Sequence, residues 1–134
     1  MIILDTNMIL RFLLQDNKEM ADKATEIIDS ENVIFTNEVA AEVVYVLNGV
    51  YQVSRSEISK VLIDFIEIDN IVSTEYGVLS KALKFFAENK LDFVDCLLCS
   101  YSLQYGYEVC TFDVKLNKFL QKINPSLDNK NNSF

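Results

Sequence analysis

The chain contains no histidine among its 134 residues. This absence excludes Ser-His-Asp hydrolysis, Cys-His proteolysis and nuclease mechanisms that use histidine as general acid or base, because each of them needs an imidazole. If the protein is an enzyme, carboxylates, a metal ion or a cofactor must therefore carry out its chemistry.

Cysteine is scarce as well, with three residues and no secretory signal, which argues against a disulfide framework. Cys96 and Cys99 have the C-x-x-C spacing of a redox motif, but they lie inside an apolar helical run and do not open a helix. With no histidine and one further cysteine, a four-ligand zinc site of the Cys/His type is excluded. We expect both cysteines to be buried as small hydrophobic residues.

The chain also lacks any apolar run close to the ~20 residues that span a bilayer. Its N-terminus shows neither the basic segment nor the small-residue cleavage site of a signal peptide. We therefore expect a cytoplasmic protein without a membrane partner. The 134 residues, 50% of them hydrophobic, predict one domain over 1–124 followed by a polar C-terminal tail over 125–134.

Basic side chains are outnumbered, with 12 lysines and arginines against 20 acids and a net charge of −8. This balance is unfavourable for a nucleic-acid partner and predicts no broad basic surface. If several of the acids surround a divalent cation, however, the cation offsets much of their charge locally. A polyanionic substrate therefore remains compatible with the composition.

Short apolar runs alternate with helical periodicities along the chain. The predicted strands are Met1–Leu4, Val33–Phe35, Asn70–Ser73 and Tyr107–Thr111. Ser54 and Glu57 spell a capping box at the start of one helix. The helix that follows Asp92 is apolar nearly all round, from Phe93 to Leu103, and is expected in the middle of the molecule. The alternation predicts an α/β fold in which helices flank a parallel sheet.

Four acidic residues end or interrupt apolar runs, and they are Asp5, Glu42, Asp95 and Asp113. Asp5 and Asp113 follow predicted strands, where the functional crevice of such sheets lies, and the other two lie near helix starts that can point into the same crevice. Glu42 and Asp95 sit among apolar neighbours, so we expect them to face protein or a cleft. An alternative is that the acids act separately, with Asp5 and Asp113 as helix N-caps.

If the four acids share one site, their mutual repulsion must be compensated. Two unit charges 4 Å apart repel by roughly 4 kcal/mol at an effective dielectric near 20. No lysine or arginine lies inside these four runs. The simplest compensating partner is a divalent cation, and hard oxygen ligands favour Mg²⁺ or Mn²⁺.

The residues around these acids resemble PIN-domain ribonucleases, and within them VapC-type toxins of toxin–antitoxin pairs. The matching segments are Asp5-Thr6-Asn7 with Arg11 and Phe12, Glu38–Val43, Leu91–Leu98 and Thr111–Asp113. Any one of them is weak, but their order and spacing over residues 1 to about 120 are fairly specific.

The resemblance implies a three-layer α/β/α fold with a central parallel sheet of about four to five strands. It implies an endoribonuclease in which one or two Mg²⁺ or Mn²⁺ ions activate water against an RNA phosphodiester. The family's acidic tetrad falls on Asp5, Glu42, Asp95 and Asp113, supported by Thr6, Asn7, Thr111 and, secondarily, Asp92. It also implies a homodimer and an antitoxin that covers the active site.

Contacts to the RNA are less defined by the sequence. The candidates are Arg11 and Lys18 after the first motif, and Lys115, Lys118 and Lys122 on one face of the last predicted helix. A solvated amphipathic surface explains each of them equally well.

Two other functions compete with the nuclease. One is a catalytically inactive relative whose acidic pocket receives a basic side chain from a partner. The other is a metal-dependent phosphatase or phospho-acceptor module, against which stands the lack of an Asp-x-Asp after the first strand and of a well-placed strand-end lysine.

Overall fold

A computed structural model describes residues 1–125 of the chain, in which there are seven helices and three strands. The chain divides into two compact units, Met1–Tyr76 and Gly77–Phe134. The predicted tail lies outside the described residues from 126 onward. Every helix within residues 1–125 is too short or too polar to cross a lipid bilayer.

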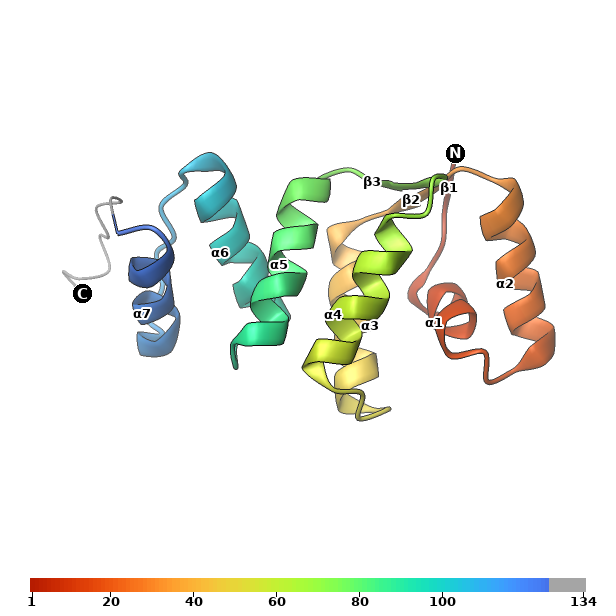
Figure 1. Ribbon diagram of the computed structural model, residues 1–134. Helices are drawn as coiled ribbons and strands as arrows, with labels where there is room; N and C mark the ends of the chain where they lie inside the picture. The colour runs from red at the N-terminus through yellow and green to blue at the C-terminus, as the bar shows by residue number, and fades with distance from the viewer. Residues whose placement is uncertain (126–134) are drawn as a thin grey trace. The chain divides into compact units, whose positions relative to one another are not determined.

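The first unit contains the sheet and four helices. Its elements are β1 (Ile2–Ile3), α1 (Thr6–Leu14), α2 (Lys18–Ser30), β2 (Val33–Phe35), α3 (Asn37–Gly49), α4 (Arg55–Ile66) and β3 (Ile71–Ser73). The strands lie side by side in the order β1-β2-β3 and all pairs are parallel (Figure 1). In the register, Val33 stands opposite Ile2 on one side and Ile71 on the other. The three strands predicted in this part of the chain are therefore confirmed.

Polar N-cap residues start all four of these helices. In α2, α3 and α4, the side-chain oxygens of Asn17, Thr36 and Ser54 each accept one hydrogen bond from the backbone N–H of the residue three positions later, at 3.1, 3.2 and 3.2 Å. Each cap satisfies an amide that has no partner within its helix. The predicted starts after Thr36 and Ser54 are confirmed.

An aromatic cluster joins the helices of this unit to its central strand. The rings of Phe35 on β2 and Phe65 on α4 meet edge to face, with centroids 5.1 Å apart, and Phe12 on α1 lies 5.8 Å from Phe65. Such pairs add about 0.5–1.5 kcal/mol to the free energy of burial. The cluster fixes α1, and with it the residues that follow β1.

The second unit consists of helices in the described residues. They are α5 (Tyr76–Glu88, whose first residue belongs to the first unit), α6 (Phe93–Tyr105) and α7 (Val114–Ile123). Edge-to-face contacts join Phe85 of α5 to Phe119 of α7, with centroids 5.2 Å apart, and Phe86 to Phe93. Gly106, with φ of 72°, ends α6 in a left-handed conformation that glycine adopts without strain.

The predicted strand Tyr107–Thr111 is wrong, so the described residues form three strands and not four to five. A strand inside a parallel sheet is buried on both faces. In this segment Tyr107 is 60% exposed and its ring is tilted against that of Tyr105, with ring centroids 5.3 Å apart, and Cys110 is also exposed.

The helix after Asp92, expected in the middle of the molecule, has one exposed side. Val94 and Leu98 on α6 are 55% and 37% exposed, while the buried face includes Ser100, whose hydroxyl donates to the Val78 carbonyl at 2.5 Å. A hydroxyl that finds a backbone acceptor can be buried at little cost. The buried positions of Cys96 and Cys99 are confirmed.

Candidate functional site

Asp5 lies directly after β1 and is the N-cap of α1. Its Oδ1 accepts the N–H of Met8 at 3.0 Å, and its backbone is extended. The capping role considered from the sequence is therefore confirmed. The bond uses one carboxylate oxygen and orients the group, so Oδ2 of this exposed residue remains able to bind a ligand.

Glu42 lies in the second turn of α3, and α3 packs against α1. Glu42 is exposed whereas Val43 and Val44 are buried, so it does not pack against protein, and that it faces a cleft stays a prediction. A helix turns about 100° per residue, so the buried valines that follow Glu42 place it on the outer part of the helix.

The second unit holds an acidic trio, which consists of Asp92, Asp95 and Asp113. Asp92 is the N-cap residue of α6, yet its side chain makes no capping hydrogen bond. Asp95 lies one turn further along α6 and is half-buried. Asp113 is the N-cap of α7, which packs against α6, and its Oδ1 accepts the N–H of Leu116 at 2.8 Å.

The three carboxylates of the trio interact electrostatically. Burial raises the pKa of Asp95, and the negative charges of Asp92 and Asp113 raise it further. Both causes disfavour the ionised form, and a cation bound beside Asp95 would remove the repulsion. Burial also raises the pKa of the neighbouring Cys99 thiol to about 12, so this cysteine is an unreactive thiol at neutral pH.

A small hydrogen-bond network holds the backbone before α7. The N–H of Asp113 donates to the Thr111 hydroxyl at 3.0 Å, and the Asn117 side chain donates to the Thr111 carbonyl, also at 3.0 Å. Asn117 was missed by the sequence analysis. An amide one turn into a helix carries no distinctive signal, and only the folded backbone brings it to the Thr111 carbonyl.

The donor chemistry of the trio fits a hard divalent cation. Within residues 1–125 no three acidic or cysteine side chains are close enough together to form a metal site. The trio nevertheless offers only carboxylate oxygens, which Mg²⁺ and Mn²⁺ prefer, and it carries repulsion that such an ion relieves.

Two of the predicted RNA contacts are bound within the chain. Arg11 donates from Nη1 to both oxygens of Asp16, at 2.8 and 2.7 Å, and from Nη2 to the Tyr51 hydroxyl at 3.0 Å. Lys18 forms an exposed ion pair with Asp22 at 2.8 Å. Their contact with RNA stays a prediction, as does the support of Asp5 by its neighbours Thr6 and Asn7, which are the first two residues of α1.

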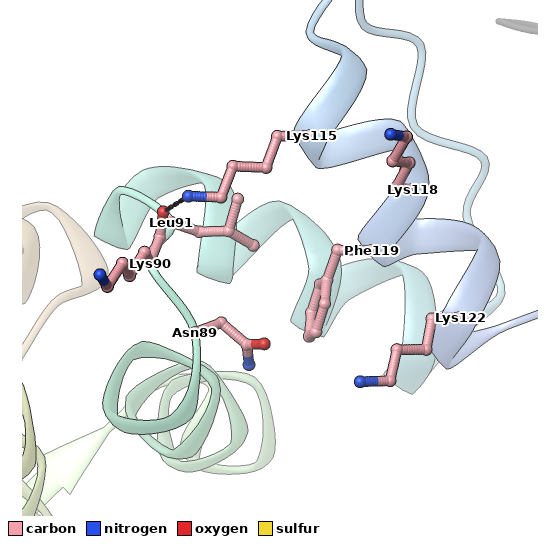
Figure 2. Close-up of a pocket in the computed structure, with 7 residues that line it drawn as sticks. All are labelled: Asn89, Lys90, Leu91, Lys115, Lys118, Phe119 and Lys122. Atoms are coloured by element: carbon pink, nitrogen blue, oxygen red, sulfur yellow. Dashed lines mark hydrogen bonds between the residues drawn. The ribbon is translucent and has the colours of Figure 1, made fainter.

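The other three candidates lie together. Lys115, Lys118 and Lys122 on α7 line one pocket with residues of the segment between α5 and α6 (Figure 2).

Comparison with known proteins places this arrangement in a family. The model of the PIN domain matches residues 2–120, which span both units from β1 to α7. Searches of curated proteins and of solved structures give no match. PIN domains have a three-layer α/β/α fold and are generally metal-dependent nucleases, in agreement with the parallel sheet, the helices and the acidic residues described above. Because the match covers most of its length, this chain belongs to the PIN domain family.

Proposed function

We propose that this protein is a metal-dependent endoribonuclease and the toxin of a toxin–antitoxin pair. The observation that carries the nuclease proposal is the acidic trio. Asp95 is held half-buried beside two further carboxylates, although this arrangement disfavours its ionised form. Such a cost is common at functional sites, where a ligand compensates it. Membership of a family of nucleases supports the same function.

We assign the metal ligands to Asp5, Glu42, Asp95 and Asp113. Asp5 and Asp113 are oriented by their capping bonds through Oδ1, which leaves the second oxygen of each for the ion. Glu42 is exposed and is either a ligand or the group that orients the attacking water. One or two bound Mg²⁺ or Mn²⁺ ions would lower the pKa of water and screen the charge that develops on the phosphodiester.

The chain's own residues position this chemistry. Two hydrogen bonds fix the backbone from which the Asp113 carboxylate extends. One joins Asn117 to Thr111, and the other joins Thr111 to Asp113. Asp92 adds a third negative charge beside Asp95 and increases the attraction for a cation. No imidazole is needed at any step, in agreement with a sequence that has none.

Cleavage of RNA tests the proposal directly. Purified protein is incubated with mixed RNA and Mg²⁺ or Mn²⁺, with and without EDTA, beside the variant Asp95→Asn. Glu88→Gln is the matched control, since it removes one negative charge from the same unit at an exposed position outside the trio. We expect cleavage that EDTA and Asp95→Asn abolish and that Glu88→Gln leaves intact. EDTA-insensitive cleavage of equal rate in all three proteins would contradict the proposal.

The toxin role rests on the resemblance of the opening Asp5-Thr6-Asn7 segment, with Arg11 and Phe12, to VapC-type toxins. We infer a cytoplasmic homodimer that an antitoxin inhibits by covering the acidic residues. Phe112 and Val114, on either side of Asp113, are 86% and 67% exposed and provide apolar area for that contact. Expression of the wild type should arrest growth of a bacterial host, whereas Asp95→Asn should not. Equal growth with both proteins would contradict the toxin role.

A further inference from the structure

A basic pocket lies in the second unit, beside α7. Its volume is about 230 Å³ and its lining residues are Asn89, Lys90, Leu91, Lys115, Lys118, Phe119 and Lys122. Figure 2 shows the three lysines of α7 on one side and the segment from Asn89 to Leu91 on the other. Four of the seven lining residues are lysines, in a chain whose net charge is −8. This concentration of positive charge predicts an anionic occupant.

The walls of the pocket are held by the fold. The ammonium group of Lys115 donates to the Lys90 carbonyl and so connects α7 to the segment before α6 (Figure 2). Phe119 is fixed by its edge-to-face contact with Phe85, and Leu91 is 4% exposed. Lys118 and Lys122 are exposed, one turn apart on α7. The pocket thus combines a fixed apolar wall with exposed cationic groups at its rim.

We propose that this pocket binds one nucleotide unit of a single-stranded RNA. Lys118 and Lys122 bind the phosphates, and the wall formed by Phe119 and Leu91 contacts the ribose or base. Proteins hold single strands by this combination of a positive groove and aromatic side chains. The volume of about 230 Å³ is below the roughly 300–1,000 Å³ of ordinary ligand pockets, so the pocket has no room for a longer segment of the strand.

The position of the pocket favours RNA over an acidic protein segment. Asp113 caps the N-terminus of α7, and Lys115 is the second residue of that helix. A strand that follows the lysines along α7 therefore runs toward the acidic trio. The choice of RNA rests on the proposed nuclease function, whereas the anionic nature of the occupant does not.

Binding of a labelled 12-nucleotide oligouridine, measured by fluorescence anisotropy in EDTA, tests the inference without any cleavage. The test variant is the double substitution Lys118→Gln and Lys122→Gln. The control is Lys81→Gln and Lys84→Gln, which removes the same charge from exposed positions on α5 outside the pocket. Thermal unfolding of both variants verifies that they fold.

We expect the pocket variant to bind about tenfold more weakly at 0.1 M salt, and the control variant within about twofold of wild type. The slope of log K against log salt should fall in magnitude by about 1.4 in the pocket variant, since each phosphate contact on a single strand contributes about 0.7. An unchanged slope, or an equal loss in both variants, would overturn the inference.

Binding of a polyglutamate peptide with the same charge as the oligouridine tests the other possible occupant, an acidic protein segment. If the pocket variant lost binding to polyglutamate and kept its full affinity for RNA, the pocket would be a protein-docking site and the inference would be wrong. Because the assay contains no metal ion, a negative result would leave the nuclease proposal untouched. Conversely, an inactive protein that bound RNA through these lysines would contradict only the nuclease.

Discussion

The two units carry their acidic residues in different environments. In the first unit, Asp5 and Glu42 are exposed, and the Asp5 carboxylate accepts a capping hydrogen bond from the N–H of Met8. In the second unit, Asp95 is half-buried and is destabilised in its ionised form by burial, Asp92 and Asp113. The difference indicates that the requirement for a cation arises in the second unit.

Loss of a trio carboxylate should produce the largest effect on activity. We expect Asp95→Asn and Asp113→Asn to lower kcat/KM for RNA cleavage by more than about 100-fold, because loss of a group that merely orients a ligand already costs about 10–100-fold. Initial rates at saturating Mg²⁺ measure this. A loss of less than tenfold in both variants would remove the trio from the site.

Substitution in the first unit should cost less. We expect Glu42→Gln to lower kcat/KM by roughly tenfold, the lower end of the range of about 10–100-fold that loss of a group orienting a metal-site ligand costs. Glu38→Gln, at an exposed position one turn earlier on α3, is the control. If Glu42→Gln lost more activity than Asp95→Asn, the first unit would contribute more to cleavage than the second, which would contradict the comparison.

Loss of the hydrogen bond from Asn117 to Thr111 should have a smaller effect on the rate of cleavage and should also lower the stability of the protein. Asn117→Ala removes it, which should cost about 1 kcal/mol of unfolding free energy and release the backbone that orients Asp113. We expect a severalfold lower kcat. Ser54→Ala removes a cap in the first unit at a similar cost in stability and should leave kcat unchanged. Equal losses of kcat would show that Asn117 acts through stability alone.

The smallest effect should be a gain in stability. Because the pKa of Asp95 is raised in the folded protein, the folded state binds its proton more tightly than the unfolded state, and stability falls as pH rises through that pKa. In metal-free buffer at pH 7, Asp95→Asn should therefore raise Tm slightly. The gain should shrink toward pH 3.8, the ordinary pKa of the group, where wild-type Asp95 is also protonated. A lower Tm for the variant at pH 7 would contradict the repulsion.

Local signals predicted the fold of the first unit well. Each helix start at Thr36 or Ser54 depends on one cap within four residues, and the strands through Val33 and Ile71 are short apolar runs that find each other as partners in the sheet. The second unit was predicted less well. Whether Tyr107–Thr111 pairs as a strand depends on a partner that the segment itself does not encode.

The candidate site shows the same limit. The sequence identified the acids and the capping roles of Asp5 and Asp113, because a cap is encoded locally. It did not predict the exposure of Glu42, which depends on how α3 is rotated against its neighbours. Asn117 was missed because its side chain donates to the Thr111 carbonyl, and Lys90 because its own carbonyl accepts from Lys115. Folding alone brings these groups together.

The central claim, that the acidic trio attracts a divalent cation, is tested most directly by thermal unfolding in increasing Mn²⁺. Wild type should be stabilised progressively, by about 2.7 kcal/mol when Mn²⁺ reaches 100 times its Kd. Asp95→Asn, which starts at the higher Tm, should show little further increase, so that the order of the two proteins reverses as Mn²⁺ rises. An equal rise of Tm in both proteins, or no rise in either, would contradict the account.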